Sequence, residues 1–129
     1  MIKAYFKNAI PYNEDKMNLP VADVEAAIPF YESVLGFQVT ARKESLFKVV
    51  ELSRDNVIIG LAENGGDPTQ DGCVFEVDNV ETALQEINSR GLKKEMSEIG
   101  IEKHGEKSWR VFYLVAPDGL CFCIGEYIK

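Results

Sequence analysis

The sequence predicts an α+β fold built from two β-α-β-β-β modules in tandem. Two segments of the first half of the chain each recur, in the same order, in the second half. The segment LPVADVEAAIPFYESVLGF recurs as FEVDNVETALQEINSRGL, which places Val77 on Val21 (77 − 21 = 56). Further on, LSRDNVIIGLAE recurs as VAPDGLCFCIGE, which places Asp118 on Asp55 (118 − 55 = 63). A duplication of this kind predicts a pseudo-symmetric fold, in which a pocket commonly lies where the two halves meet.

Each module contains one predicted helix. Asp23 and Asn79 stand where a side chain can cap the first free amides, and Gly36 and Gly91 can end each helix with a left-handed residue. Pro29 is unfavourable inside a helix, so we expect either a later helix start or a kink there. Apolar residues at helical spacing form the buried stripes: Val24, Ala27, Ile28, Tyr31 and Leu35 in the first helix, and Val80, Ala83, Leu84 and Ile87 in the second.

Short runs of β-branched and aromatic residues after each helix predict strands. Asp55-Asn56 and Pro117-Asp118-Gly119 are typical turns between the last two strands of each module. The segment 1–15 is less regular and is expected to give an extended first strand or an arm, and 94–107 is expected to be a polar loop. The predicted strands are Phe37–Ala41, Phe47–Leu52, Asn56–Ala62, Trp109–Val115 and Leu120–Tyr127.

The length of 129 residues predicts a single domain, since neither module is large enough to bury a sufficient core alone. Module 1 is expected at about 1–63 and module 2 at about 72–129, joined by the turn-rich connector 63–72. No apolar run approaches the roughly 20 residues that cross a bilayer, which argues against a membrane protein. With no signal-like N-terminal segment, and three cysteines with no evident disulfide framework, we expect a cytoplasmic protein.

The net charge of −7, with lysines and arginines scattered along the chain, argues against a nucleic-acid partner because such a chain repels phosphates. A cationic or neutral small molecule fits this charge better. An acidic balance is also a common solubility device, and that is the simpler interpretation.

The order of elements, together with VADVEAAIPFYESVLGF and WRVFYLVAPDGLCFCIGEY, resembles the glyoxalase, bleomycin-resistance and extradiol-dioxygenase superfamily, the vicinal oxygen chelate fold. The resemblance covers the chain from about Lys16 to the C-terminus. It implies paired curved mixed sheets around a cup open to solvent, and commonly a homodimer.

Enzymes of this superfamily hold a divalent metal through side chains from the first and last strand of each module. Counting along the repeat gives Lys16, Gly72, Gly60 and Cys123 as the equivalent positions, since 72 − 16 = 56 and 123 − 60 = 63. Lysine is protonated and glycine has no side-chain donor, so only Cys123 could ligate a metal. We therefore expect no metal site and no cofactor.

The remaining metal-binding or acid-base candidates are isolated. His104 is the only histidine, and in the polar segment IEKHGEK a solvated side chain is the more common role. A soft site from Cys121, Cys123 and His104 lacks a short ligand spacing. Cys73 is expected to point away from the cup as a small buried hydrophobe.

Alternation along the strands predicts which residues face the cup. We expect Arg110 with Phe112 in the cup, rather than Trp109 with Tyr113, because the helix-facing side should not accept an arginine. Glu76 needs a cation or donor, such as Lys16, Arg110 or a positively charged ligand, and it is a candidate catalytic base beside His104. The expected ligand-binding residues are Asn18, Ile58, Gly60, Glu76, Arg110, Phe112, Cys121 and Cys123.

Three functions remain open. The first is a metal-free small-molecule binding protein of the bleomycin-resistance type, which sequesters an antibiotic or a cationic or aromatic metabolite. The alternative is a glyoxalase-like lyase or isomerase, or a dioxygenase, with a shifted metal site or a metal-free mechanism that uses Glu76 as base. The third is a structural or regulatory protein that uses the fold for dimerisation alone.

Overall fold

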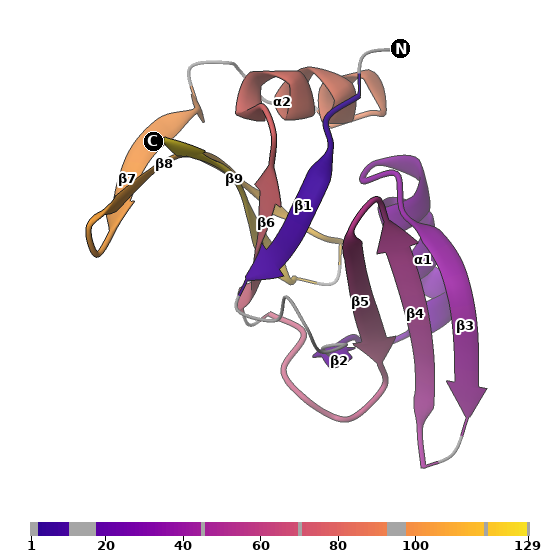
Figure 1. Cartoon of the computed structure of the whole chain (residues 1–129). Coiled ribbons are helices and arrows are strands. Elements are labelled where there is room, and N and C mark those ends of the chain that lie inside the picture. Colours follow the sequence, from indigo (N-terminus) through magenta and orange to yellow (C-terminus); the bar gives the residue numbers. More distant parts are fainter. Residues whose placement is uncertain are drawn as a thin grey trace.

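The computed structural model describes residues 3–10, 18–44, 46–69, 71–92, 98–117 and 119–128. They form two curved mixed sheets that lie side by side (Figure 1). The first sheet has the strand order β2-β5-β4-β3 and the second the order β1-β6-β9-β8-β7. The elements are β1 (Phe6–Ile10), β2 (Asn18–Pro20), α1 (Val24–Ser33), β3 (Gln38–Glu44), β4 (Lys48–Arg54), β5 (Val57–Ala62), β6 (Asp71–Val77), α2 (Val80–Ser89), β7 (Gly100–His104), β8 (Lys107–Val115) and β9 (Cys121–Ile128).

The pairing of the strands confirms the sequence repeat. In the first sheet β2 pairs in parallel with β5, with Asn18 opposite Gly60. In the second sheet β6 pairs in parallel with β9, with Val74 opposite Cys123. The separations are 74 − 18 = 56 and 123 − 60 = 63, the two offsets of the sequence repeat. The two modules are therefore equivalent in strand register as well as in strand order.

Both helices begin where their capping residues predict. The Ala26 amide donates to the Asp23 carboxylate, and the Thr82 amide donates to the Asn79 side chain. Of the two alternatives expected for Pro29, a late start of α1 is wrong, since the helix begins at Val24 and continues through Pro29. A kink at Pro29 stays a prediction. Pro29 lies on the exposed side of α1.

The N-terminal segment forms the expected extended strand, but it belongs to the second sheet. β1 runs antiparallel to β6, with Ile10 opposite Val74. Its beginning is also fixed to the first module, because the Phe6 amide donates to the Asp55 carboxylate and the Asn56 amide donates to the Phe6 carbonyl. β1 therefore ties the two modules together.

The expected polar loop at 94–107 is wrong in its second half. β7 forms a hairpin with β8, with Ile101 opposite Arg110 and a turn that contains Gly105 at φ +70°. The part at 93–97 lies outside the described residues. β7 is an edge strand on which Ile101 and Lys103 are exposed, and the polar composition of the segment does not indicate a strand.

The helix-facing sides of the two sheets share one core. Phe75 at its centre contacts the rings of Phe6, Phe37 and Phe122, with ring centroids 5.6, 5.5 and 5.1 Å away. Tyr31 of α1 packs edge-on against Phe122 of β9. Aromatic rings from both modules thus interdigitate, and the described part of the chain has one main hydrophobic core.

A buried ion pair links the modules beside this core. The Arg54 guanidinium of β4 donates to the Glu86 carboxylate of α2 at 2.6 Å, and their side chains are 6% and 0% exposed. Arg54 also donates to the carbonyls of Leu35 and Ala4, and Glu86 accepts from the Ala4 amide and from Arg90. Each charge is therefore satisfied by several polar partners.

Candidate ligand-binding site

The outward face of the second sheet carries a small hydrophobic cluster separate from the core. Along β8 the side chains of Phe112 and Leu114 enter the core, whereas Trp109 and Val111 lie on the opposite face with Cys123 of β9. Ile10 of β1 and Val74 of β6 pack against this cluster. A sheet face that buries apolar side chains away from the main core is a candidate binding surface.

These side chains line an apolar pocket of about 120 Å³: Ile10, Val74, Trp109, Val111 and Cys123. Gly125 lies beside it, where an added Cβ would be 3.1 Å from Val111 and 3.3 Å from Trp109. The absence of a side chain there lets the Trp109 ring lie close to the strand. The Tyr127 ring then packs against Trp109, with 5.4 Å between ring centroids.

Polar groups on the same face lie around this apolar pocket. Tyr113, opposite Cys123, donates its hydroxyl proton to the Glu102 carboxylate of β7, and this hydrogen bond raises the pKa of Tyr113. The Asn8 side-chain amide of β1 donates to Glu76 of β6 at 2.7 Å. The apolar pocket is thus accompanied by two carboxylates, each hydrogen-bonded to a neutral donor.

The two buried cysteines, Cys73 and Cys123, are protonated at neutral pH. Burial raises the pKa of the Cys123 thiol to about 12, and the Glu102 charge contributes. Burial likewise raises the pKa of Cys73 to about 12, and its position in the core confirms that it points away from the cup. A thiol in this state is a poor nucleophile and a poor metal ligand, so Cys123 acts here as part of an apolar wall.

The prediction that Arg110 and Phe112 of β8 face the cup is wrong, because both side chains lie on the helix-facing side of the sheet. Phe112 is fully buried in the core, and Arg110 reaches the first turn of α2, where it donates to Glu81 at 2.7 Å. Glu126 lies 3.9 Å from the Arg110 guanidinium. The helix-facing side accepts an arginine because two carboxylates meet it there, so Trp109 and Val111 take the places expected for Arg110 and Phe112. Arg110 is also not the partner of Glu76.

The other expected ligand residues are divided between the two sheets. Cys121 and Glu76 share the outward face with Cys123, but only Cys123 lines the apolar pocket. Ile58 and Gly60 lie on the first sheet, where Ile59 and Leu61 fill the core and Ile58 is 46% exposed on the opposite side. Asn18 pairs with Gly60 through β2. The described residues therefore do not bring the eight predicted residues together in one pocket.

Comparison with known proteins identifies the fold. The sequence model of the Glyoxalase/Bleomycin resistance protein/Dioxygenase superfamily matches residues 15–119. The chain belongs to this superfamily. No curated protein matches the chain.

Several solved structures share the fold of this chain. A bleomycin-binding protein complexed with bleomycin is 21% identical, with a TM-score of 0.61, and the match covers 88% of this chain and 97% of that one. A bleomycin resistance determinant encoded on the transposon Tn5 is 20% identical, with a TM-score of 0.63 and the same coverage. TnmS3, an antibiotic binding protein from Streptomyces sp. CB03234, is 16% identical, with a TM-score of 0.62 over 92% of this chain and 99% of that one. At these identities the likeness shows a common fold.

The positions that carry metal ligands in superfamily enzymes do not fit a metal here. Gly60 offers no side-chain donor. Gly72 follows an irregularity in the β6 register, and an added Cβ would lie 2.5 Å from the Phe122 ring, so this position is directed at the core and not at the cup. Lys16 lies outside the described residues. Among the residues that the structure describes, no three His, Cys, Asp or Glu side chains gather closely enough to hold a metal ion.

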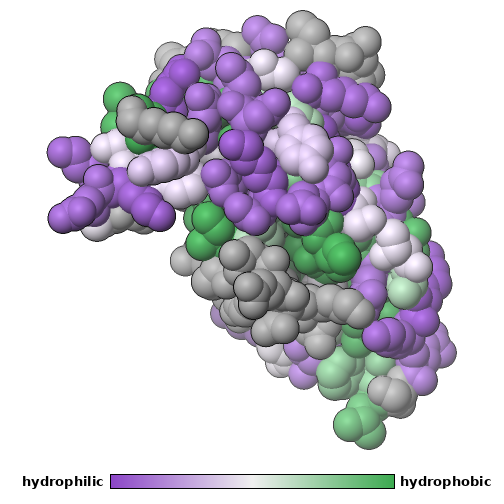
Figure 2. All heavy atoms as spheres, in the orientation of Figure 1, coloured by the Kyte–Doolittle hydropathy of each residue, from purple (hydrophilic) through white to green (hydrophobic). Residues whose placement is uncertain are grey.

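Hydrophobic residues reach the surface near the middle of the molecule, where the two sheets approach each other, and hydrophilic residues cover much of its upper part (Figure 2). Within the described ranges, no helix has the length and apolar character that a membrane crossing requires.

Proposed function

We propose that this protein binds a small organic molecule on the outward face of the second sheet and sequesters it. The observation that carries this proposal is the apolar pocket formed by Trp109, Val111, Cys123, Val74 and Ile10 on the side of the sheet away from the core. Its tryptophan wall offers a flat surface for stacking, and the nearby Glu76 and Glu102 favour a guest that also carries a positive charge.

The size of the pocket defines which part of the guest it holds. At about 120 Å³ it is smaller than the roughly 300 to 1,000 Å³ typical of sites that enclose a drug-sized ligand. We infer that a single ring or a short apolar group inserts beside Trp109, while the rest of the guest lies along the sheet. The bleomycin-binding and antibiotic-binding proteins of the same fold support a natural-product guest of this kind.

Trp109 provides the test, because it is the only tryptophan in the chain and its ring lines the pocket. Titration with bleomycin, and with a panel of cationic aromatic antibiotics, is expected to give a saturable change in Trp109 fluorescence for at least one compound. Val74→Phe, which fills the pocket, is expected to abolish that change.

Ile101→Phe is the matched control. Ile101 is 70% exposed, lies on the helix-facing side of the second sheet opposite Arg110 and does not line the pocket, so this variant is expected to bind like the unmodified protein. Equal binding by both phenylalanine variants would refute the assignment of the pocket, and no saturable change with any compound would count against small-molecule binding.

We also propose that two chains associate so that the outward faces of the sheets cover each other. These faces expose large apolar side chains, among them Ile58 of the first sheet and Tyr113 and Val115 of the second. Burying them would complete a ligand groove around the small pocket. Light scattering during gel filtration is expected to give the mass of a dimer, and Ile58→Lys is expected to shift it toward the monomer.

Ile101→Lys serves as the control for association. Ile101 is 70% exposed and pairs with Arg110 on the helix-facing side of the second sheet, away from the proposed interface. A monomeric mass for the unmodified protein would refute the dimer.

An enzymatic role with Glu76 as base has less support, because Glu76 does not line the pocket and accepts a hydrogen bond from Asn8.

A further inference from the structure

A second and larger cavity lies at the junction of the two modules, away from the apolar pocket. It has a volume of about 460 Å³ and lies within the range typical of ligand sites. None of its lining residues belongs to the apolar pocket. Its wall comes from the segment before β1, the start of β3, the β4–β5 turn and the end of α2, so both modules contribute to it.

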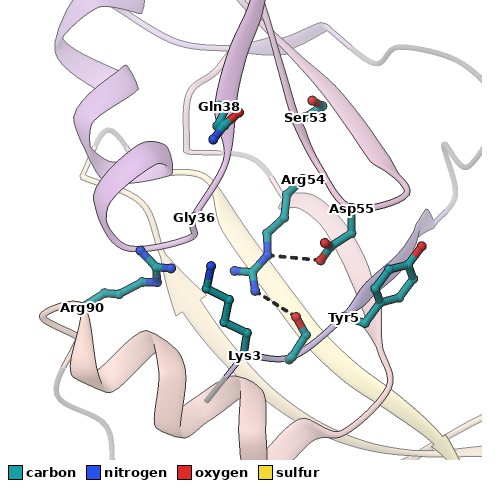
Figure 3. Close-up of a pocket in the computed structure, with 9 residues that line it drawn as sticks. Lys3, Tyr5, Gly36, Gln38, Ser53, Arg54, Asp55 and Arg90 are labelled. Carbon is teal, nitrogen blue, oxygen red and sulfur yellow. Dashed lines mark hydrogen bonds and ion pairs between the residues drawn. The ribbon is translucent and has the colours of Figure 1, made fainter. Parts of the chain in front are cut away.

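Three cationic side chains converge on this cavity. The Lys3 ammonium and the guanidinium groups of Arg54 and Arg90 point toward the same space beside Gly36 (Figure 3). An added Cβ at Gly36 would lie 2.7 Å from Arg54 Nη1 and 3.5 Å from Arg90 Cζ, which shows how closely both guanidinium groups approach the Gly36 backbone. Gly36 also has φ +75°, so a side chain at this position would be strained as well as obstructive.

The nearby carboxylates are already engaged. Glu86 accepts hydrogen bonds from Arg54, from Arg90 Nε and from the Ala4 amide. Asp55 accepts from the Phe6 amide and Arg54 Nε. Three positive charges thus face two negative ones, which leaves an excess of one positive charge in a chain whose net charge is −7.

Hydrogen-bond donors remain available at the cavity. Arg90 uses its Nε for Glu86, and within the described part of the chain its two terminal nitrogens have no hydrogen-bond partner, nor does the Lys3 ammonium. The hydroxyl of Ser53 and the side-chain amide of Gln38 also line the cavity. A guanidinium offers a planar fork of donors that matches a carboxylate or phosphate group.

We propose that this junction cavity binds a small molecule with a phosphate or carboxylate group, held by Arg90 and Lys3 with the Arg54 guanidinium behind it. The neutral polar residues of the wall suit hydroxyl or amide groups on the rest of the molecule. This anion site is independent of the guest proposed for the apolar pocket. Because its donors come from both modules, an anion bound there also strengthens their association.

The test is a titration with inorganic phosphate and, separately, with acetate, at constant ionic strength set by chloride. Amide chemical shifts followed by NMR are expected to change saturably in the millimolar range or below, and the changes should centre on Gly36, Ser53, Asp55 and Lys3. Saturation by phosphate alone would identify a phosphate site, and saturation by acetate a carboxylate site.

Variants locate the site. Lys3→Gln and Arg90→Gln are each expected to weaken binding of the saturating anion by about tenfold, the effect of removing one charged hydrogen bond of roughly 1.5 kcal/mol. Lys103→Gln removes the same charge from the exposed strand β7 and is the matched control, expected to leave binding unchanged. Lys3 has no hydrogen bond to the described residues, so its variant is expected to fold normally even if Arg90→Gln does not.

Val74→Phe separates this proposal from the proposed function, since it is expected to block the apolar pocket and to leave anion binding unchanged. The anion site is refuted if neither anion gives saturable shifts around Gly36, or if Lys3→Gln and Lys103→Gln bind equally well. A loss of anion binding in Val74→Phe would also overturn it, because the two sites would then not be independent.

Discussion

Arg54→Met is expected to lower the free energy of unfolding by about 3–5 kcal/mol, the usual cost of removing one partner of a buried ion pair. The Glu86 side chain is 0% exposed and would lose its 2.6 Å partner. The carbonyls of Leu35 and Ala4 would each lose a donor as well. Urea denaturation measures the change.

Arg42→Met is the control for this prediction. Arg42 pairs with Glu25, but the two side chains are 52% and 55% exposed, and such surface pairs contribute about 0–1 kcal/mol. Similar losses in both variants would show that the buried pair has no special role. A loss below about 1 kcal/mol in Arg54→Met would have the same meaning.

The pH dependence gives this pair a distinct signature. Burial alone would raise the pKa of Glu86, but hydrogen bonds from Arg54 and the Ala4 amide, together with the Arg54 charge, hold it below its usual value. The stability from this lowered pKa is present above the ordinary carboxyl pKa of about 4.3 and is lost as the pH falls through the lower pKa of the folded state. The stability gap between the unmodified protein and Arg54→Met should therefore narrow in acid, and a constant gap would contradict the assignment.

Phe75→Ala is expected to cost about 3–5 kcal/mol, as for other large-to-small changes of a buried aromatic residue. Phe75 contacts rings from β1, from the segment before β3 and from β9, so its removal leaves a cavity where both modules meet. Unfolding should remain a single transition, because the core is shared and neither module has an independent one.

Phe47→Ala gives the reference for this second prediction, since Phe47 is 37% exposed near the start of β4. Its loss is expected to be much smaller. Two separate unfolding transitions in Phe75→Ala, or a loss no larger than that of Phe47→Ala, would show that the aromatic cluster does not join the modules.

The sequence was sufficient for the fold class because the repeat specifies most of the elements and their register, although β7 was not anticipated. The offsets of 56 and 63 reappear as the pairings of Asn18 with Gly60 and of Val74 with Cys123. The capping residues located both helix starts. β1 could be predicted only as an extended segment, because nothing in its own residues shows that its partner, β6, lies in the other module.

The candidate site was less predictable, for a physical reason. Trp109, Val111 and Tyr113 alternate with Arg110, Phe112 and Leu114, so both faces of β8 are largely apolar and the pattern does not tell them apart. The residue that could have shown which face of β8 is turned toward the helix is Glu81 in the first turn of α2, because its carboxylate is a partner for Arg110 on that side. Likewise, Gly72 follows a register irregularity that simple alternation does not anticipate.

The position of β1 determines what would happen to the chain if it were cut. A break in the connector between Ala62 and Asp71 would leave β1 on the N-terminal fragment and its partner β6 on the C-terminal fragment. The N-terminal fragment would carry the complete first sheet and an unpaired β1, whereas the C-terminal fragment would lack the edge strand of the second sheet. Reassembly of the two fragments would therefore depend on a strand that one half supplies to the sheet of the other.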